Sequence, residues 1–124
     1  MDVNEISKIV LDAAIAVHKT LGGPGLLESV YQDALVYELG IRGLRVEKEV
    51  AVPVIYKGVQ VGDPLRIDIL VEGQVVIECK ATDKDNPIFA VQTLTYLRLL
   101  NLRLGLLINF GKGTLIEGYQ RVIN

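Results

Sequence analysis

The stretch that decides the fold reads Leu65-Arg66-Ile67-Asp68-Ile69-Leu70-Val71, Glu72-Gly73-Gln74, Val75-Val76-Ile77-Glu78-Cys79-Lys80. Branched aliphatic residues on either side of a glycine predict two strands, residues 65–71 and 75–80, joined by a tight turn. Side chains alternate between the two faces of a strand. Alternation places five apolar side chains and the buried thiol on one face: Ile67, Ile69, Val71, Val75, Ile77 and Cys79.

The length of the turn decides whether the charged side chains of the two strands meet. Burying the two apolar sets together requires an odd number of loop residues or a bulge, because an even loop places Asp68 opposite Ile77. Gly73 can supply this geometry as the left-handed third residue of a three-residue loop over 71–73. Hydrophobic pattern and turn chemistry therefore predict a common face for Arg66, Asp68, Glu78 and Lys80.

This charged face has two interpretations. Two carboxylates and an ammonium group on an apolar sheet suit Mg²⁺-assisted phosphodiester hydrolysis, because hard oxygen ligands hold the ion and a lysine can orient water or stabilise developing charge. The alternative is a solvated hairpin face with cross-strand ion pairs. The polar segment 81–86 after Lys80, typical of a strand that ends at a cleft, and the apolar ends of the hairpin favour the metal site.

The rest of the chain predicts a mixed sheet flanked by helices, an α/β (α+β) fold. Apolar periodicity indicates helices over residues 3–21 and 26–39, and Asn86-Pro87 is typical of the start of a further helix that runs to about 101. Alternation predicts a strand over 44–54, in which Pro53 favours a sheet edge, and two last strands over 103–110 and 114–122. The strands 75–80 and 103–110, separated by a helix, can pair in parallel.

Length and composition limit the class of protein. A chain of 124 residues fits one domain, 1–124, and no apolar run approaches the roughly 20 residues of a membrane span. The single cysteine, Cys79, and an N-terminus without a signal-peptide pattern indicate a reducing cytoplasm. The apolar composition, 50% of residues, favours a homodimer. A net charge of −2 gives no global attraction to nucleic acid, so such a partner requires a local basic patch or bound metal ions.

The chain resembles, over essentially its whole length, the small bacterial and archaeal GxxExxY proteins of the PD-(D/E)XK nuclease superfamily. The naming motif stands as Gly25-Leu26-Leu27-Glu28-Ser29-Val30-Tyr31, preceded by Val17-His18-Lys19. The superfamily aspartate matches Asp68, its Glu-x-Lys matches Glu78-Cys79-Lys80, and its helical glutamine matches Gln92. One departure is that Ile67, not proline, precedes Asp68.

The resemblance implies a restriction-endonuclease-like fold and a nuclease that cleaves DNA, in preference to RNA, with Mg²⁺ or Mn²⁺. It assigns Asp68 and Glu78 as metal ligands and Lys80 as the catalytic lysine. The carbonyl of Cys79 joins the ligands, and Glu28 on an early helix completes them. The alternative function is a catalytically silent module that uses the same fold to bind nucleic acid or protein.

The secondary candidates each have a competing explanation. Glu28 at the start of a helix also fits the positive end of the helix dipole, and Gln92 can face solvent instead of the site. Tyr31 can hydrogen-bond Glu28, but packing is the preferred interpretation. His18, the only histidine, is expected to have a structural capping role in preference to catalysis. Cys79 is expected to be a core thiol.

Overall fold

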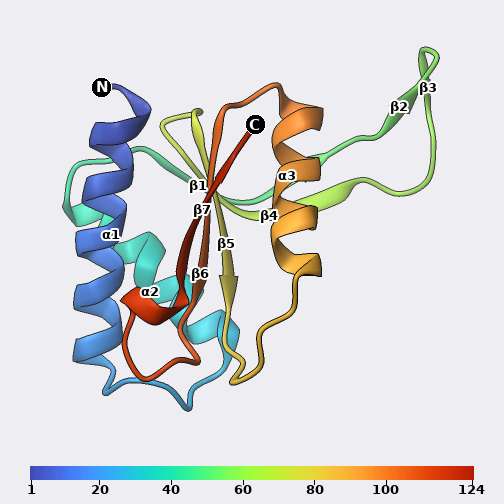
Figure 1. Ribbon diagram of the computed structural model, residues 1–124. Helices are drawn as coiled ribbons and strands as arrows, with labels where there is room; N and C mark the ends of the chain where they lie inside the picture. Colours follow the sequence, from blue (N-terminus) through green and yellow to red (C-terminus); the bar gives the residue numbers. More distant parts are fainter.

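A mixed five-stranded sheet separates two layers of helices in the computed structural model, which describes all residues from 1 to 124 (Figure 1). Helices α1 and α2 pack on one face of the sheet and α3 packs on the other. The predicted mixed sheet flanked by helices is confirmed. The helices are α1 (Val3–Thr20), α2 (Glu28–Ile41) and α3 (Ile88–Leu100), and none of them has the length and hydropathy needed to cross a membrane.

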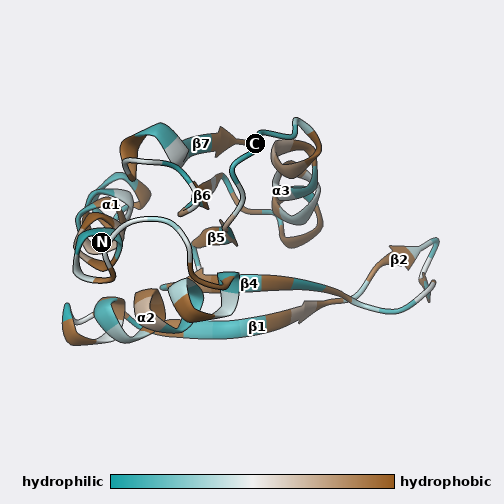
Figure 2. Ribbon diagram, turned by 90° about the horizontal axis from the view of Figure 1, so that it is seen from below, coloured by the Kyte–Doolittle hydropathy of each residue, from teal (hydrophilic) through white to brown (hydrophobic).

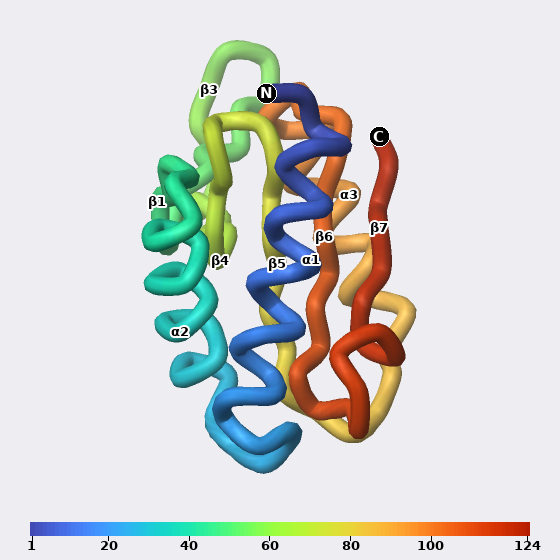
Figure 3. The backbone as a smooth tube through the Cα atoms, turned by 90° about the vertical axis from the view of Figure 1, so that its left-hand side faces the viewer, coloured from blue at the N-terminus to red at the C-terminus, as the bar shows by residue number.

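The sheet order is β1 (Val46–Val52), β4 (Leu65–Val71), β5 (Val75–Lys80), β6 (Leu104–Asn109) and β7 (Tyr119–Ile123). Figure 3 shows these strands behind α1 and α2. β5 and β6 run parallel, as predicted for two strands separated by a helix, and the other neighbours are antiparallel. β1 forms one edge, and it ends just before Pro53, which has no N–H to donate to a ladder.

Local side-chain contacts define where the helices begin. The Asp2 carboxylate accepts a hydrogen bond from the Glu5 N–H at 2.8 Å at the start of α1. The Asn86 side chain accepts one from the Ile88 N–H at 3.1 Å, and α3 begins at Ile88, one residue after Pro87, the predicted first helical position. The cap that the Asn-Pro pair predicts is therefore present.

The loop between β4 and β5 has an odd number of residues, as the hydrophobic pattern requires. Val71 pairs with Val75, so the loop is the three residues 72–74, one position later than predicted. Glu72 and Gly73 both have left-handed backbone, with φ of 53° and 63°, and the Gln74 N–H donates to the Val71 carbonyl at 2.9 Å. The odd loop keeps the apolar residues of β5 and of the turn end of β4 on one side of the sheet.

The core has two parts, one on each side of the sheet. The larger cluster of 19 buried residues joins α1 and α2 to the sheet, and the smaller cluster of 6 includes Leu97 of α3. The prediction that Ile67 shares a face with Ile69 and Val71 is wrong, because Ile67 packs in the smaller cluster. The β1–β4 ladder is interrupted at Glu49, whose left-handed φ of 53° twists the hairpin at the level of Asp68.

Two further segments differ from the predictions. The stretch after β1 forms a separate small hairpin, β2 (Ile55–Tyr56) and β3 (Val59–Gln60), which projects from the body of the molecule (Figure 2). The last predicted strand, 114–122, begins as the 3-10 helix η1 (Ile116–Gly118) and becomes β7 only at Tyr119. A local cap favours this turn, because the Thr114 hydroxyl accepts the Glu117 N–H at 3.3 Å.

Candidate active site

Asp68 and Glu78 lie where the paired part of β4 and β5 ends. The last pair in register is Ile69 with Ile77. Beyond that pair, the Asp68 N–H donates to Glu78 Oε1 at 3.1 Å, and the Cys79 N–H donates to Asp68 Oδ2 at 2.8 Å. The side chains thus replace the missing ladder hydrogen bonds, and each carboxylate is fixed by the opposite strand.

This donor set fits a hard divalent cation that keeps part of its water shell. Asp68 Oδ1 and Glu78 Oε2 accept no backbone hydrogen bond, and the two carboxyl groups are close enough to hydrogen-bond each other when one is protonated, a position that a cation can take instead. No group of three or more His, Cys, Asp and Glu side chains stands at metal-binding distances. Mg²⁺ is commonly held by one or two carboxylates together with water and substrate phosphate, so two carboxylates suffice.

The site holds a carboxyl group that resists ionisation. Burial and the neighbouring Asp68 charge raise the pKa of Glu78 from 4.5 to about 8. Burial also raises the pKa of Asp68, opposed by the hydrogen bond from the Cys79 N–H. At neutral pH the pair therefore tends to carry one proton, held by Glu78, until a cation balances the two negative charges.

Lys80 leaves the same strand as Glu78 and is held against an aromatic ring. Its Nζ lies 4.4 Å from the centroid of the Phe89 ring, in the first turn of α3. The Lys80 charge lowers the pKa of Asp68, of Glu78 and of Glu28, although burial outweighs it at all three carboxyls. The ammonium group therefore acts electrostatically on the same small region that holds the carboxylate pair.

Glu28 lies at the first residue of α2, on the margin of this region. Burial raises the pKa of its carboxyl, Lys80 lowers it and Asp68 raises it. Tyr31 is fully buried and stacks on Phe110 at 4.8 Å between ring centroids. The Tyr31 hydroxyl donates to the Gly23 carbonyl at 2.6 Å and accepts the Leu26 N–H at 3.2 Å, so it fixes the loop that leads into Glu28. Packing, the preferred interpretation of Tyr31, is confirmed.

The other sequence candidates have different surroundings. Gln92 is exposed on α3, one turn before Tyr96, and burial and the two carboxylates raise the pKa of the Tyr96 hydroxyl. His18 is buried, and its Nε2 lies 3.0 Å from the Lys112 carbonyl oxygen. This contact is structural. The Cys79 thiol lies in the larger core cluster, as predicted, and burial raises its pKa.

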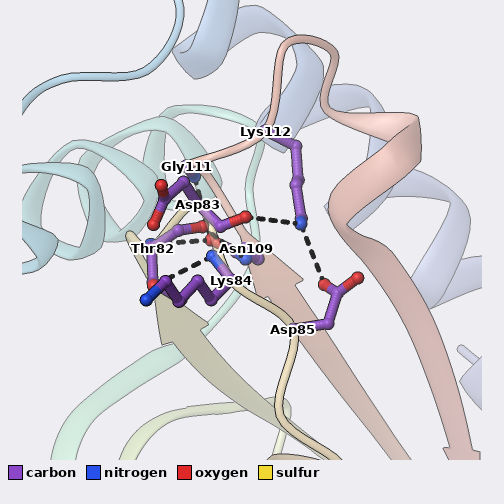
Figure 4. A network of polar contacts seen from close by, with 7 residues as sticks. All are labelled: Thr82, Asp83, Lys84, Asp85, Asn109, Gly111 and Lys112. Atoms are coloured by element: carbon purple, nitrogen blue, oxygen red, sulfur yellow. Dashed lines mark hydrogen bonds and ion pairs between the residues drawn. The ribbon is translucent and has the colours of Figure 1, made fainter.

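Asn109 is a supporting residue that the sequence reasoning missed. At the end of β6 its Oδ1 accepts the N–H groups of Thr82 and Gly111, at 3.1 and 2.9 Å, and its Nδ2 donates to the Thr82 carbonyl at 2.9 Å (Figure 4). Lys112 adds a contact with Asp85 at 3.0 Å. Together they hold the segment that follows Lys80. The signal in the sequence is a single amide residue at the end of the otherwise apolar stretch 104–109.

A cavity of about 510 Å³ adjoins this region without containing the carboxylate pair. Phe89 lines the cavity and also contacts Lys80, so the two features share one wall. Asn109 and Tyr119 line it from the β6 and β7 side. Asp68 and Glu78 are the better candidates for chemistry, because they are largely buried and fixed by backbone hydrogen bonds, whereas the acids that line the cavity, Asp85 and Glu117, are exposed.

The fold and this site define a nuclease-like protein, and comparison with protein families agrees. The family model of the PD-(D/E)XK nuclease superfamily matches residues 4–122, so the chain belongs to this superfamily. Its three helices and mixed five-stranded sheet are consistent with the restriction-endonuclease-like fold. Comparison with curated proteins and with solved structures finds no match. Nucleases of this superfamily generally use divalent metals and act on nucleic acid.

Proposed function

We propose that this protein is a Mg²⁺-dependent nuclease that hydrolyses phosphodiester bonds in DNA, in preference to RNA. The observation that carries the proposal is the pairing of Asp68 and Glu78 at the open end of the β4–β5 hairpin, where only one oxygen of each carboxylate accepts a backbone hydrogen bond. Lys80, two residues after Glu78, supplies the positive charge beside them. The sequence resemblance matches these three residues to the acidic pair and the lysine of the superfamily.

Asp68 and Glu78 would hold the metal ion through the oxygen of each carboxylate that accepts no backbone hydrogen bond. When bound, Mg²⁺ polarises the phosphoryl group and lowers the pKa of a coordinated water. The N–H and C=O groups of one strand residue point to the same side of the strand, and the Cys79 N–H points at Asp68. The Cys79 carbonyl is therefore directed to the same side, which supports its proposed role as a third ligand. Glu28 is the proposed residue that would complete the ligand set.

Lys80 is the proposed catalytic lysine. Its ammonium group orients the attacking water or stabilises the charge that develops on the phosphate oxygens. The Phe89 ring limits the directions that the flexible lysine side chain can take. Gln92, exposed on the same helix as Phe89, is proposed to contact the substrate.

The finer assignments rest on this proposal and on the sequence. We propose that the protein is one domain of the GxxExxY group, because Gly25, Glu28 and Tyr31 stand at the motif spacing and Tyr31 fixes the loop before Glu28. A cytoplasmic location fits the single, buried Cys79. A homodimer fits the apolar composition.

A cleavage assay tests the function. Purified protein is incubated with single- and double-stranded DNA and with RNA, in Mg²⁺, in Mn²⁺ and in chelator. We expect metal-dependent cleavage of DNA that is lost in Asp68→Ala and kept in Asp63→Ala, a matched change of an exposed aspartate in the loop before β4. Full activity of Asp68→Ala would mean that the metal site lies elsewhere or that a contaminant cleaves. DNA binding without cleavage or metal dependence would favour the silent binding module.

A further inference from the structure

The outer face of α2, together with Leu27 just before it, carries a line of apolar residues, four of which are exposed. Leu27 exposes 74% of its surface, Tyr37 70%, Ile41 64% and Val30 40%, and Ala34 at the centre of the line is partly buried. We call these five residues, Leu27, Val30, Ala34, Tyr37 and Ile41, the α2 seam. Singly exposed apolar residues are ordinary on a protein surface, but a contiguous line of them marks an interaction site.

The spacing of the α2 seam is that of a helix that packs on another helix. The five positions are separated by three, four, three and four residues, the a and d positions of a heptad. The core-facing residues of α2 include Tyr31, Leu35 and Leu39, on the opposite side of the helix. α2 is thus apolar on two sides, and of the seam residues only Ala34 packs against the larger core cluster. Figure 3 shows α2 at the outside of the helical layer, beside α1.

The polar residues that border the α2 seam are already paired within the chain. The Asp33 carboxylate contacts Lys48 Nζ at 2.6 Å, and the Glu38 carboxylate contacts Arg42 Nε at 2.7 Å. The remaining charged residue of α2, Glu28, forms no ion pair and is negative, so α2 carries no free cation beside the seam. A nucleic-acid backbone, which needs free cations, does not fit such a surface.

The arrangement of side chains along the seam is symmetric about its centre, which favours a second copy of α2 packed in the antiparallel direction as the partner. Ala34 is the midpoint of the line, with Leu27 and Ile41 seven residues away on either side. In an antiparallel pair of α2 helices related by a two-fold axis at Ala34, Leu27 meets Ile41 of the second copy. Val30 and Tyr37 approach each other in the same way, and the small Ala34 side chains allow the backbones to come close at the crossing point.

We propose that two copies of this chain associate through their α2 seams, antiparallel, with Ala34 at the two-fold axis. Each seam ends at Leu27, the residue before Glu28. The interface therefore borders the candidate active site at Glu28. A standard interface uses about 20–30 residues on each side, and the seam offers five, so we expect dissociation in the micromolar range. The proposal does not depend on nuclease activity.

Other exposed surfaces are less suited to a second copy. The exposed apolar residues of α3, Ile88, Val91 and Leu99, are interrupted by Thr95 and Arg98. The β2–β3 hairpin exposes Tyr56, and β7 is an edge strand that exposes Ile123. These last two are the alternative routes to a dimer and supply matched controls.

Sedimentation equilibrium over a range of concentrations tests the surface. Tyr37→Lys and Ile41→Lys should shift the monomer–dimer midpoint at least tenfold upward. The matched changes Tyr56→Lys and Ile123→Lys, at side chains of the same type that are each 61% exposed, should leave the midpoint within twofold of the parent. Circular dichroism controls for folding. A parent chain that is monomeric at all concentrations, or a dimer lost only in the control variants, would overturn the proposal.

Disulfide trapping tests the orientation. Ala34→Cys should form a disulfide-linked dimer on mild oxidation, because the two Cα atoms at the axis fall within about 7 Å. Leu27→Cys mixed with Ile41→Cys should give the mixed dimer in preference to either self-linked dimer. The native Cys79 is buried and does not compete. Self-linked Leu27→Cys as the main product would contradict the antiparallel arrangement, and absence of any trapping in Ala34→Cys would contradict the interface.

Discussion

Asp68 donates its backbone N–H to Glu78 Oε1 at 3.1 Å, at the first position where β4 and β5 no longer pair. The separation of the two strands and the approach of the two acids are therefore one structural feature. A carboxylate that closes a sheet ladder is rigid, and rigidity at a metal ligand lowers the entropy that binding must overcome.

Removing either carboxylate should remove metal binding. Asp68→Asn and Glu78→Gln keep the size of the side chains, but each withdraws one of the two charged ligands from a hydrated Mg²⁺ ion. We expect calorimetric titration with Mg²⁺ or Mn²⁺ to lose measurable heat of binding in both variants. Glu47→Gln, an exposed glutamate in β1, is the matched control and should bind as the parent does. Unchanged affinity in Glu78→Gln would contradict the assignment of Glu78 as a ligand.

Changing Lys80 should separate chemistry from metal binding. Lys80→Ala removes a positive charge beside the ion, so metal affinity should be unchanged or higher, while single-turnover cleavage slows by about 10²–10⁴-fold. Lys80→Arg should not restore the rate, because a planar guanidinium cannot replace a compact ammonium at a crowded site. Lys8→Ala, an exposed lysine of α1, controls for loss of net charge. Parent-like single-turnover rates in Lys80→Ala would exclude a catalytic role for this side chain.

The stability of the metal-free protein should fall as pH rises from about 4.5 to about 8. The pKa of Glu78 is raised in the folded state, so folding favours its protonated form, and ionising it opposes folding. The stabilisation is complete below the unfolded-state pKa and is lost as pH passes the folded-state value, by at most about 1.4 kcal/mol per pH unit. Urea unfolding across this range measures the slope.

Glu78→Gln is the control for the pH effect, because its side chain does not titrate. The variant should show a flatter dependence of the free energy of unfolding on pH than the parent. Added Mg²⁺ should stabilise the parent most at the alkaline end, since metal binding requires the ionised carboxylate. A parent and variant with parallel pH profiles would show that Glu78 ionises normally.

Tyr31→Phe should destabilise the protein by about 1 kcal/mol. The change keeps the ring stacked on Phe110 but removes the hydroxyl that holds Gly23 and Leu26. Tyr37→Phe removes an exposed hydroxyl and should have almost no effect. Urea denaturation compares the two. Equal stability of both variants would mean that the loop before Glu28 is fixed by other contacts.

Asn109→Ala should loosen the segment after Lys80 and lower stability by roughly 1–3 kcal/mol, because Thr82 and Gly111 lose their partners. Asn109→Asp keeps the acceptor oxygen and should lose less. Trypsin cleavage after Lys84, an exposed residue of this segment, should accelerate in the order parent, Asn109→Asp, Asn109→Ala. The same cleavage rate in all three proteins would contradict the anchoring role of Asn109.

The site residues on β4 and β5 could be predicted because a strand has a simple period. Alternation predicts one face for Asp68 and Glu78, and in the structure the odd turn around Gly73 sets the register that brings the two acids together. The same rule failed at Ile67, because parity holds only while the strand stays regular. A single left-handed residue, Glu49, on the neighbouring strand interrupts the regular pairing. The residues around Asp68 contain no pattern that predicts this interruption.

The sequence by itself determined the helices, the strands of the central hairpin, the parallel β5–β6 pair and the common position of the acidic pair, since these depend on periodicity and turn chemistry within a few residues. Only the tertiary structure decided that the Asp68 and Glu78 carboxylates close the end of the ladder, and that burial raises the pKa of Glu78 to about 8. It also decided that Asn109, from a distant strand, anchors the segment after Lys80. These properties depend on strand separation, desolvation and long-range packing, which arise only when the whole chain has folded.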